Sequence, residues 1–326
     1  MKLKINMKNN PNLIAKNSNS LREAFGKVLT KISKTNKRII VLDADIAGGT
    51  GLHHFKKKFK KRFIQCGIAE QNMMAMAGSL SLLGFIPVVT TFSVFMLRAF
   101  EQARLSIAYS NLNVKIVASH PGLDVGPDGA SAQCLEDLAC FRSLPNFSIL
   151  SPCDSNEIEL ATKSIINHKG PIYMRTGRSE SETFFNKRFG FEIGKGRELI
   201  SGSQFYIIGC GATTLRAYKA ALKLKKINIS VGVINMSTIK PIDHNLLKKV
   251  SKKVKAILTV EDHSVYGGLG SAVAESLSKT KVDVFIKGMN TFGESGEPDE
   301  LAKKYGIDEN SIYKEIIKIK NNYDKS

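Results

Sequence analysis

The sequence predicts an α/β protein made of two parallel-sheet, three-layer domains. The length of 326 residues allows two domains of ordinary size. The composition, with 43% hydrophobic and 24% charged residues, is that of a globular protein, which excludes a disordered chain, a collagen and a small disulfide scaffold. Short apolar runs alternate with helical patterns in two successive series along the chain, as in parallel α/β sheets.

The first series follows a polar N-terminal arm, residues 1–17. Ser20 to Glu23 fits a helix capping box, and apolar residues continue at helical spacing to Ile32. Further strands are expected at 39–42, 62–66, 86–92, 114–119, 147–150 and 172–175, and further helices at 71–83, 96–109 and 155–167. These elements place a first domain at residues 18–182.

The second series begins after a mixed, glycine-containing segment, residues 183–200, which we interpret as a linker. Its strands are expected at 204–208, 229–234, 256–260 and 282–286, and its helices at 212–224, 244–250, 271–277 and 311–319. The second domain is therefore placed at residues 201–322.

The chain is strongly basic, with a net charge of +19 from 48 Lys and Arg against 29 Asp and Glu. Such a balance suits nucleic acid, an anionic membrane or phosphorylated substrates. The excess is mostly lysine, however, which favours a compositional bias spread over solvated faces. No nucleic-acid-binding motif and no apolar stretch near the ~18 residues of a membrane span occur, so neither partner is expected.

The five cysteines indicate a reducing compartment. Their number is odd and no CxxC spacing occurs, which argues against both a disulfide framework and a zinc site. The N-terminus is basic and polar and lacks the apolar core of a secretory signal. We therefore expect a cytoplasmic protein.

Several short motifs indicate turns rather than ligand sites. Gly209-Cys210-Gly211 and Gly267-Gly268-Leu269-Gly270 each lack the third glycine of the dinucleotide fingerprint, which favours tight turns into helices. His53-His54 precedes a lysine-rich run and has no third ligand at metal spacing. This pair is predicted to lie in a solvated loop, and no metal site is expected.

Two segments carry more specific chemistry. Gly67 allows a turn after a strand, and Glu70 then lies in the first turn of an apolar helix, where the helix dipole stabilises an anion. By spacing alone this glutamate is a common N-terminal charge. The stretch from His120 to Gly129 is long and glycine-rich after another strand, as in active-site loops or simply a long turn.

The order of the motifs resembles the C-terminal part of the transketolase family of thiamine-diphosphate enzymes. The resemblance runs from about residue 18 to 319, nearly the whole chain. The motifs, in family order, are Asp43-Ala44-Asp45, Gly67 to Asn72, Thr91 to Phe95, Gly126 to Ser131, Leu135-Glu136-Asp137, Pro152-Cys153-Asp154, Lys240 to Asp243, Glu261-Asp262-His263 and Gly267 to Gly270. A set of this size in one order is far more specific than any single match.

This resemblance implies a thiamine-diphosphate pyrimidine-binding domain followed by the transketolase C-terminal domain, as in the C-terminal subunit of a split transketolase. The GDG signature that holds Mg²⁺ and the diphosphate does not occur, because Pro127 precedes Asp128-Gly129. A separate N-terminal diphosphate-binding subunit would hold the Mg²⁺, and the two kinds of chain are expected to form a heterotetramer. The implied reaction moves a two-carbon ketol group between sugar phosphates through a thiamine-diphosphate carbanion.

The resemblance also implies roles around the cofactor. Glu70 matches the glutamate that hydrogen-bonds the aminopyrimidine ring, and a carboxylate can share a proton with a ring nitrogen in a dry site. Phe92 and Phe95 match the aromatic pocket around that ring. Arg98 lies three residues further on, on the same expected helix face, and resembles the arginine of the deoxyxylulose-phosphate synthase branch. Asp45 matches an acidic residue near the cofactor.

On the substrate side, His120 matches a histidine near the bound sugar and is a catalytic candidate. Asp128 matches a residue that reads a substrate hydroxyl. Arg178 matches a contact to the substrate phosphate, with Arg175 as a second candidate, and a guanidinium suits bidentate phosphate binding. His263 is expected to be structural or interfacial.

One departure from the family pattern affects the expected substrate. Ala132 stands where the family usually has a histidine that assists proton transfer. Either His120 or a partner's group takes that role, or the substrates differ from the usual pentose phosphates. Three alternatives therefore stay open: the β subunit of a 2-oxoacid dehydrogenase, a deoxyxylulose-phosphate-synthase-like enzyme, and a catalytically degenerate regulatory subunit.

Overall fold

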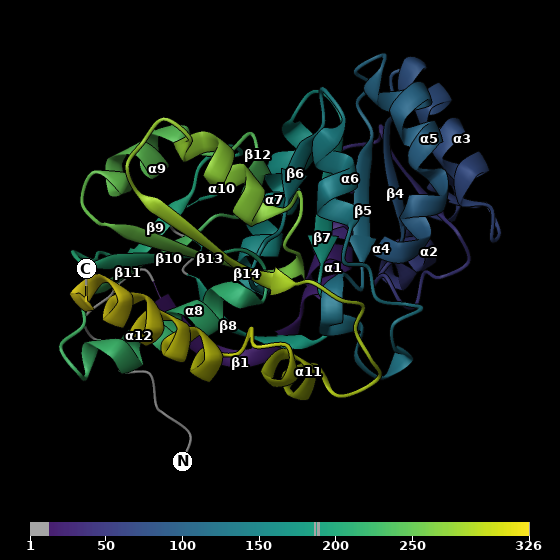
Figure 1. Ribbon diagram of the computed structural model, residues 1–326. Coiled ribbons are helices and arrows are strands. Elements are labelled where there is room, and N and C mark those ends of the chain that lie inside the picture. Colours follow the sequence, from purple (N-terminus) through teal and green to yellow (C-terminus); the bar gives the residue numbers. More distant parts are fainter. Residues whose placement is uncertain (1–12, 186, 188–189, 326) are drawn as a thin grey trace.

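The computed structural model describes residues 13–185, 187 and 190–325, which form two α/β domains side by side (Figure 1). The first domain holds a seven-stranded sheet in the order β12-β6-β7-β5-β4-β2-β3. Its strands are β2 (Ile39–Asp43), β3 (Phe63–Gln65), β4 (Ile86–Phe92), β5 (Lys115–Ser119), β6 (Ser148–Leu150), β7 (Ile172–Thr176) and β12 (Thr238–Lys240). All neighbouring strands except β12 and β6 are parallel, so their carboxyl ends meet at one edge.

Helices cover both faces of this sheet because its strands alternate apolar side chains between two cores. Val41, Val88 and Val117 pack in a cluster with α1 and α7, whereas Leu42 and Ile116 pack in another with α3 and α6. The helices are α1 (Leu21–Ile32), α2 (His53–Lys58), α3 (Glu70–Leu82), α4 (Ser93–Met96), α5 (Phe100–Gln102), α6 (Asp137–Ser143) and α7 (Ser155–Asn167). This confirms the three-layer arrangement expected for the first domain.

The second domain is built on a five-stranded sheet in the order β14-β13-β10-β11-β9. Its strands are β9 (Arg197–Ile200), β10 (Phe205–Gly209), β11 (Val231–Asn235), β13 (Ala256–Ser264) and β14 (Asp283–Met289), and only β9 is antiparallel to its neighbour. Its helices are α8 (Thr213–Lys225), α9 (His244–Ser251), α10 (Leu269–Leu277), α11 (Pro298–Lys304) and α12 (Glu309–Lys325). Figure 1 shows α8 and α12 below this sheet and α9 and α10 above it.

The structure corrects the expected arm and linker. Residues 13–17 belong to β1 (Leu13–Ser20), which pairs with β8 (Glu180–Phe185) in an antiparallel ribbon, whereas residues 1–12 of the arm lie outside the described residues. The expected linker 183–200 loses its first residues to β8 and its last to β9. These strands were missed because the ribbon is rich in polar residues and lacks the alternating apolar pattern that marks a strand.

Two further differences concern short elements. The expected helix at 96–109 is a chain of brief turns: α4, η3 (Leu97–Ala99), α5 and the π-helical η4 (Ala103–Ala108). Helical periodicity does not distinguish these turn types over so few residues. The strand β12 leaves the second domain and pairs with β6, so it completes the sheet of the first domain.

The junction between the domains also involves a loop that follows β14. Ser295 Oγ donates to the Pro127 carbonyl oxygen at 2.6 Å, and Gln133 Nε2 donates to the Glu294 carbonyl oxygen at 2.8 Å. The second domain therefore holds the 126–133 loop of the first. Within the described residues, no helix is both long enough and apolar enough to cross a membrane.

Candidate active site

Glu70 lies at the carboxyl edge of the first sheet, as the first residue of α3. Its side chain is 5% exposed. The nearest charged group is Arg98, whose NH1 lies 3.7 Å from Oε1, and no described residue donates a hydrogen bond to the carboxylate. An ionised carboxylate accepts several hydrogen bonds, so Glu70 keeps the capacity to accept a further donor beside its ion pair with Arg98.

Two aromatic rings lie next to Arg98, the ion-pair partner of Glu70. Phe92 and Phe95 stack with their planes 11° apart and their centroids separated by 5.6 Å. The Arg98 guanidinium lies 5.2 Å from the centroid of Phe95, so these two residues share a helix face as expected. Gly49 packs against Phe92, because a Cβ at this glycine would lie 2.9 Å from the ring. Arg98 is 59% exposed, and the site therefore opens to the surface.

Asp45 stands on the turn that precedes this site, with a positive φ of 63°. Gln65, at the end of β3, organises the turn. Its Oε1 accepts the backbone N–H groups of Asp45 at 2.9 Å and Gly67 at 3.1 Å, and its Nε2 donates to the Asp45 carboxylate at 3.3 Å. The sequence motifs did not single out Gln65, although its position immediately before Gly67 at a strand end was the available signal.

His120 joins the site from the end of β5. Its ring stacks on Phe92 with centroids 3.7 Å apart, and Nδ1 is 2.9 Å from the hydroxyl of Ser119. Burial, reinforced by the positive charges of Arg22 and Arg178, lowers the pKa of His120 to about 3. The imidazole is therefore neutral near neutral pH, when it can donate or accept one proton through hydrogen bonds but carries no charge.

Asp128 and Arg178 come together beside this histidine. Arg178 NH1 lies 3.5 Å from Asp128 Oδ1 and also donates to the Val125 carbonyl oxygen. Both side chains remain partly exposed. The charge of Arg178 also acts on His120, so the structure brings three of the expected substrate residues to one place. Ala132 lies in the turn that follows, where its N–H donates to Gly129.

Two aspartates, Asp124 and Asp262, fix the 120–129 loop through backbone N–H groups. Asp262, on β13 of the second domain, accepts the Leu123 N–H at 2.8 Å, and Asp124 accepts the backbone N–H groups of Arg178 at 2.5 Å and Ser179 at 3.1 Å. Burial, together with the neighbouring charge of Asp262, raises the pKa of Asp124 to about 6. Both aspartates line a cavity of about 690 Å³ between the domains, to which Glu70 and Phe95 do not contribute. Sequence reasoning missed both as site residues.

Arg175, the second candidate for the phosphate contact, is paired with a buried carboxylate. Its Nε donates to Asp137 Oδ2 at 2.8 Å, its NH2 donates to Oδ1 of the same carboxylate, and NH1 donates to the Asp262 carbonyl oxygen at 3.0 Å. The side chain is 5% exposed. Burial alone would raise the pKa of Asp137, but the Arg175 ion pair outweighs burial and lowers it. Arg175 is therefore part of a buried ion pair within the first domain, and its NH1 bond to Asp262 links that pair to the second domain. Its expected phosphate contact stays a prediction.

Glu261 and His263 form a buried pair in the second domain. The Glu261 oxygens accept the N–H groups of Leu269 at 2.6 Å and Gly270 at 2.8 Å, at the start of α10. Burial, followed by the charge of Arg175, lowers the pKa of His263 to about 4. His263 Nε2 accepts the Ala139 N–H at 3.3 Å, so its contact to the first domain agrees with the structural or interfacial role expected for it.

The fold and the site together define a two-domain α/β protein with a place for a flat heterocycle at the carboxyl edge of its first sheet. Two family models match: residues 17–183 fit the pyrimidine-binding domain of transketolase, and residues 194–312 fit the transketolase C-terminal domain. The chain belongs to the transketolase family. Thiamine diphosphate is the cofactor that this family implies.

Individual relatives agree with this assignment. A protein of Methanocaldococcus jannaschii, named for a transketolase C-terminal section, is 42% identical over 91% of this chain and 95% of its own length. Human transketolase is 38% identical over 89% of this chain but only 47% of its own length, so the chain spans about half of that relative. A solved structure titled as a split-gene transketolase, an inactive β4 tetramer, superposes with a TM-score of 0.86 at 41% identity, covering 92% of this chain and 97% of that one.

The residues present fit the pyrimidine end of thiamine diphosphate. Glu70 supplies a buried carboxylate without a hydrogen bond from the described residues, which suits a ring nitrogen that shares a proton. Phe92 and Phe95 offer aromatic faces on which a flat heterocycle can pack. The GDG signature expected for the diphosphate and Mg²⁺ is absent from this sequence.

Proposed function

We propose that this chain is the C-terminal subunit of a transketolase that transfers a two-carbon ketol group between sugar phosphates. The observation that carries the proposal is the buried Glu70 carboxylate, which accepts no hydrogen bond from the described residues and is paired with Arg98 next to Phe95. When bound, thiamine diphosphate supplies the nucleophilic carbon that accepts the two-carbon unit. The remaining work falls to the residues of the protein.

The site residues divide these tasks between cofactor and substrate. Glu70 holds a proton at the pyrimidine ring, and Phe92 orients the ring by packing. Neutral His120 would provide a hydrogen-bonding group to the substrate without adding charge. Asp128 and Arg178 are separated by 3.5 Å and provide, respectively, an acceptor for substrate hydroxyls and a cation for the phosphate.

We infer that a second polypeptide completes this site and holds the diphosphate and Mg²⁺. Arg98 is 59% exposed, so the cofactor side opens at the surface. Five large apolar side chains on or next to α3 and η4 are more than half exposed: Ile68, Leu82, Leu83, Leu105 and Tyr109. An exposed apolar group of this kind is typical of a protein interface. The split-gene relative and the half-length match to human transketolase support a separate N-terminal subunit, and we propose that the two kinds of chain form a heterotetramer.

The choice of donor and acceptor sugars depends on which residue transfers protons on the substrate. Ala132 has no proton to transfer at the position where the family usually has a histidine. His120 lies at the same loop and is the candidate for that role. We also propose that the enzyme is cytoplasmic, since its odd number of cysteines suits a reducing compartment.

Calorimetric titration of thiamine diphosphate with Mg²⁺ tests the proposal. The chain alone is compared with a mixture that also contains a diphosphate-binding transketolase subunit. We expect binding only in the mixture, together with ketol transfer among a panel of sugar phosphates. Tight binding by the chain alone would overturn the shared site. Cofactor binding without turnover across the panel would instead identify a regulatory subunit.

A further inference from the structure

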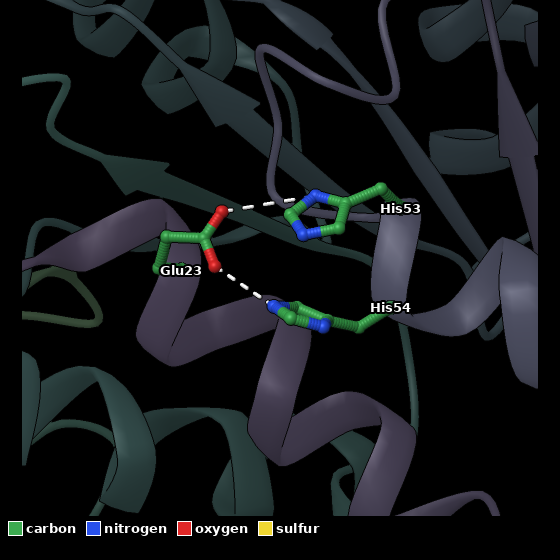
Figure 2. A group of neighbouring side chains, drawn as sticks. All are labelled: Glu23, His53 and His54. Carbon is green, nitrogen blue, oxygen red and sulfur yellow. Dashed lines mark hydrogen bonds and ion pairs between the residues drawn. The ribbon is translucent and has the colours of Figure 1, made fainter.

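Three side chains outside the candidate active site come together where α1 meets α2 (Figure 2). Glu23 lies in the first turn of α1, and His53 and His54 begin α2. His54 Nε2 is 2.8 Å from Glu23 Oε2, and His53 Nδ1 is 3.7 Å from Glu23 Oε1. One ligand atom from each residue lies within 4.8 Å of the other two. Two imidazoles and a carboxylate are ligands that Zn²⁺ and other late transition metals accept.

The two helices are held at a fixed separation by backbone contacts that do not involve these side chains. A Cβ on Gly26 of α1 would lie 1.9 Å from the Gly51 carbonyl oxygen, and a Cβ on Gly51 would lie 2.2 Å from the Arg22 carbonyl oxygen. Arg22 also donates to the Gly49 carbonyl oxygen at 3.1 Å. Binding a metal would therefore require side-chain rotation but no movement of the helices, which favours a pre-organised site.

We propose that Glu23, His53 and His54 bind a divalent transition-metal ion, with Zn²⁺ as the favoured ion. The side chains are 32%, 50% and 34% exposed, so an ion can enter from solvent and water can complete its coordination. The ion would replace the hydrogen bond between His54 and Glu23. Mg²⁺ and Ca²⁺ are excluded because they prefer oxygen ligands.

The local charge limits the affinity of this site. Five lysines follow the histidines on α2 and η2 (Lys60–Arg62), and they repel a cation through solvent. The ligand set is neutral apart from Glu23, and imidazole must be unprotonated to bind. Metal affinity should therefore rise with ionic strength and fall in acid.

The site would act on the loop that supports the candidate active site. Residues 44–52 connect β2 to α2, and Gly49 within them packs against Phe92. An ion shared by α1 and α2 would hold the α2 end of this connection against α1. The sequence pattern concealed the third ligand because Glu23 precedes His53 by 30 residues and was assigned to a capping box. The Ser20 hydroxyl does accept the Glu23 N–H, but the carboxylate turns toward the histidines instead.

Metal titration of the full-length, untagged chain tests the proposal. Zn²⁺ binding is measured by calorimetry and Co²⁺ binding by visible absorption, with Glu23→Gln and His54→Asn as variants. We expect one ion per wild-type chain and at least about a tenfold loss of affinity in each variant. His244→Asn is the matched control, because His244 is exposed and pairs with Ser276 in the second domain. Circular dichroism establishes that each variant is folded.

Three results would overturn the site. One is the absence of saturable Zn²⁺ and Co²⁺ binding by the wild-type chain. Another is binding that both variants retain. The third is a Co²⁺ charge-transfer band that reveals thiolate ligands from the cysteines. As a second readout, Zn²⁺ should raise the Tm of the wild-type chain but not that of Glu23→Gln. An equal Tm shift in both proteins would also contradict the assignment.

Discussion

Each domain places a buried glutamate against the N-terminus of a helix, but the two carboxylates meet opposite surroundings. Glu261 is enclosed, and both its oxygens accept backbone N–H groups of α10. Glu70, at the start of α3, receives no hydrogen bond from the described residues and lies beside an exposed arginine. A buried glutamate at a helix N-terminus therefore stabilises the fold when backbone N–H groups occupy both its oxygens, as at Glu261. It can bind a ligand when its oxygens accept no such bonds, as at Glu70.

Replacing the open glutamate should have the largest effect on activity. In the assembled enzyme, Glu70→Gln should lower kcat by at least about 100-fold, because the amide cannot share a proton with the cofactor ring. The Tm of the chain should change little, since the carboxylate satisfies no described N–H group. Steady-state kinetics and thermal melts measure both quantities. Glu101→Gln, an exposed neighbour, is the control, and wild-type turnover in Glu70→Gln would remove the distinction between the two glutamates.

Replacing His120 should have the next largest effect on activity. We expect His120→Asn to lower kcat/KM by about 100-fold, while the pH profile between 5 and 8 keeps its shape. The reason is that a pKa of about 3 leaves the imidazole uncharged over that range.

The lowered pKa of His120 also affects stability. The free energy of unfolding of the wild-type chain should decrease as pH falls from 6.5 toward 3, which is the opposite of what a salt-bridged histidine causes. His120→Asn should lose less stability over the same range. Titration of His120 near pH 6.5 by NMR would contradict this.

Asp124 lines the cavity between the domains, and replacing it should affect activity less than replacing Glu70 and more than replacing Glu261. Asp124→Asn turns an amide toward the N–H groups of Arg178 and Ser179 and should shift Arg178. We expect KM for a phosphorylated donor to rise by about tenfold with kcat preserved, a change of about 1.4 kcal/mol. KM for an unphosphorylated donor should stay constant. Equal changes for both donors would indicate a general packing defect, and Asp299→Asn, an exposed residue of the same cavity, is the control.

Replacing the sealed glutamate should affect activity least. Glu261→Gln should lower the free energy of unfolding by about 1–3 kcal/mol, because the amide leaves one N–H group of α10 unpaired. Turnover per folded, assembled molecule should stay near wild type. Chemical denaturation and active-site titration together separate the two outcomes. A large loss of kcat with unchanged stability would mean that Glu261 also belongs to the active site.

The same variant makes a pH prediction. Burial raises the pKa of Glu261 from 4.5 to about 7, against the lowering effect of the Gly270 and Leu269 N–H groups. The folded state therefore holds a proton that the unfolded state has released. Stability from this group is present below pH 4.5 and is lost as pH rises through 7. Subtracting the Glu261→Gln unfolding curve from wild type should isolate this decline.

Regular, apolar elements of the fold were predictable from the sequence, and polar or very short ones were not. The helix expected at 155–167 matches α7 (Ser155–Asn167), because Asp154 caps it and its apolar spacing is regular. The ribbon of β1 and β8 has no such pattern, and β12 has only three residues. Its pairing with β6 depends on contacts across the chain that local periodicity does not contain.

The candidate site shows the same division. Glu70, Phe92, Phe95 and Arg98 were identified through motifs that are contiguous or nearly so, and the structure brings Phe95 and Arg98 together as expected. The ion pair of Arg175 could not be predicted because its partner, Asp137, lies 38 residues away. Asp262 and Glu23 were missed for the same reason: each contacts residues far from it in the chain, and no spacing rule connects them.

The strand β12 has a consequence for how such a chain can change during evolution. One apolar cluster runs without a break from Met73 of the first domain through Ile239 of β12 to Leu269 of the second. Exchanging one domain for that of a distant homologue would leave an unmatched sheet edge and a mismatched core on both sides of the crossover. The two domains should therefore be inherited and recombined as a pair, and a change to one is expected to select compensating changes in the other.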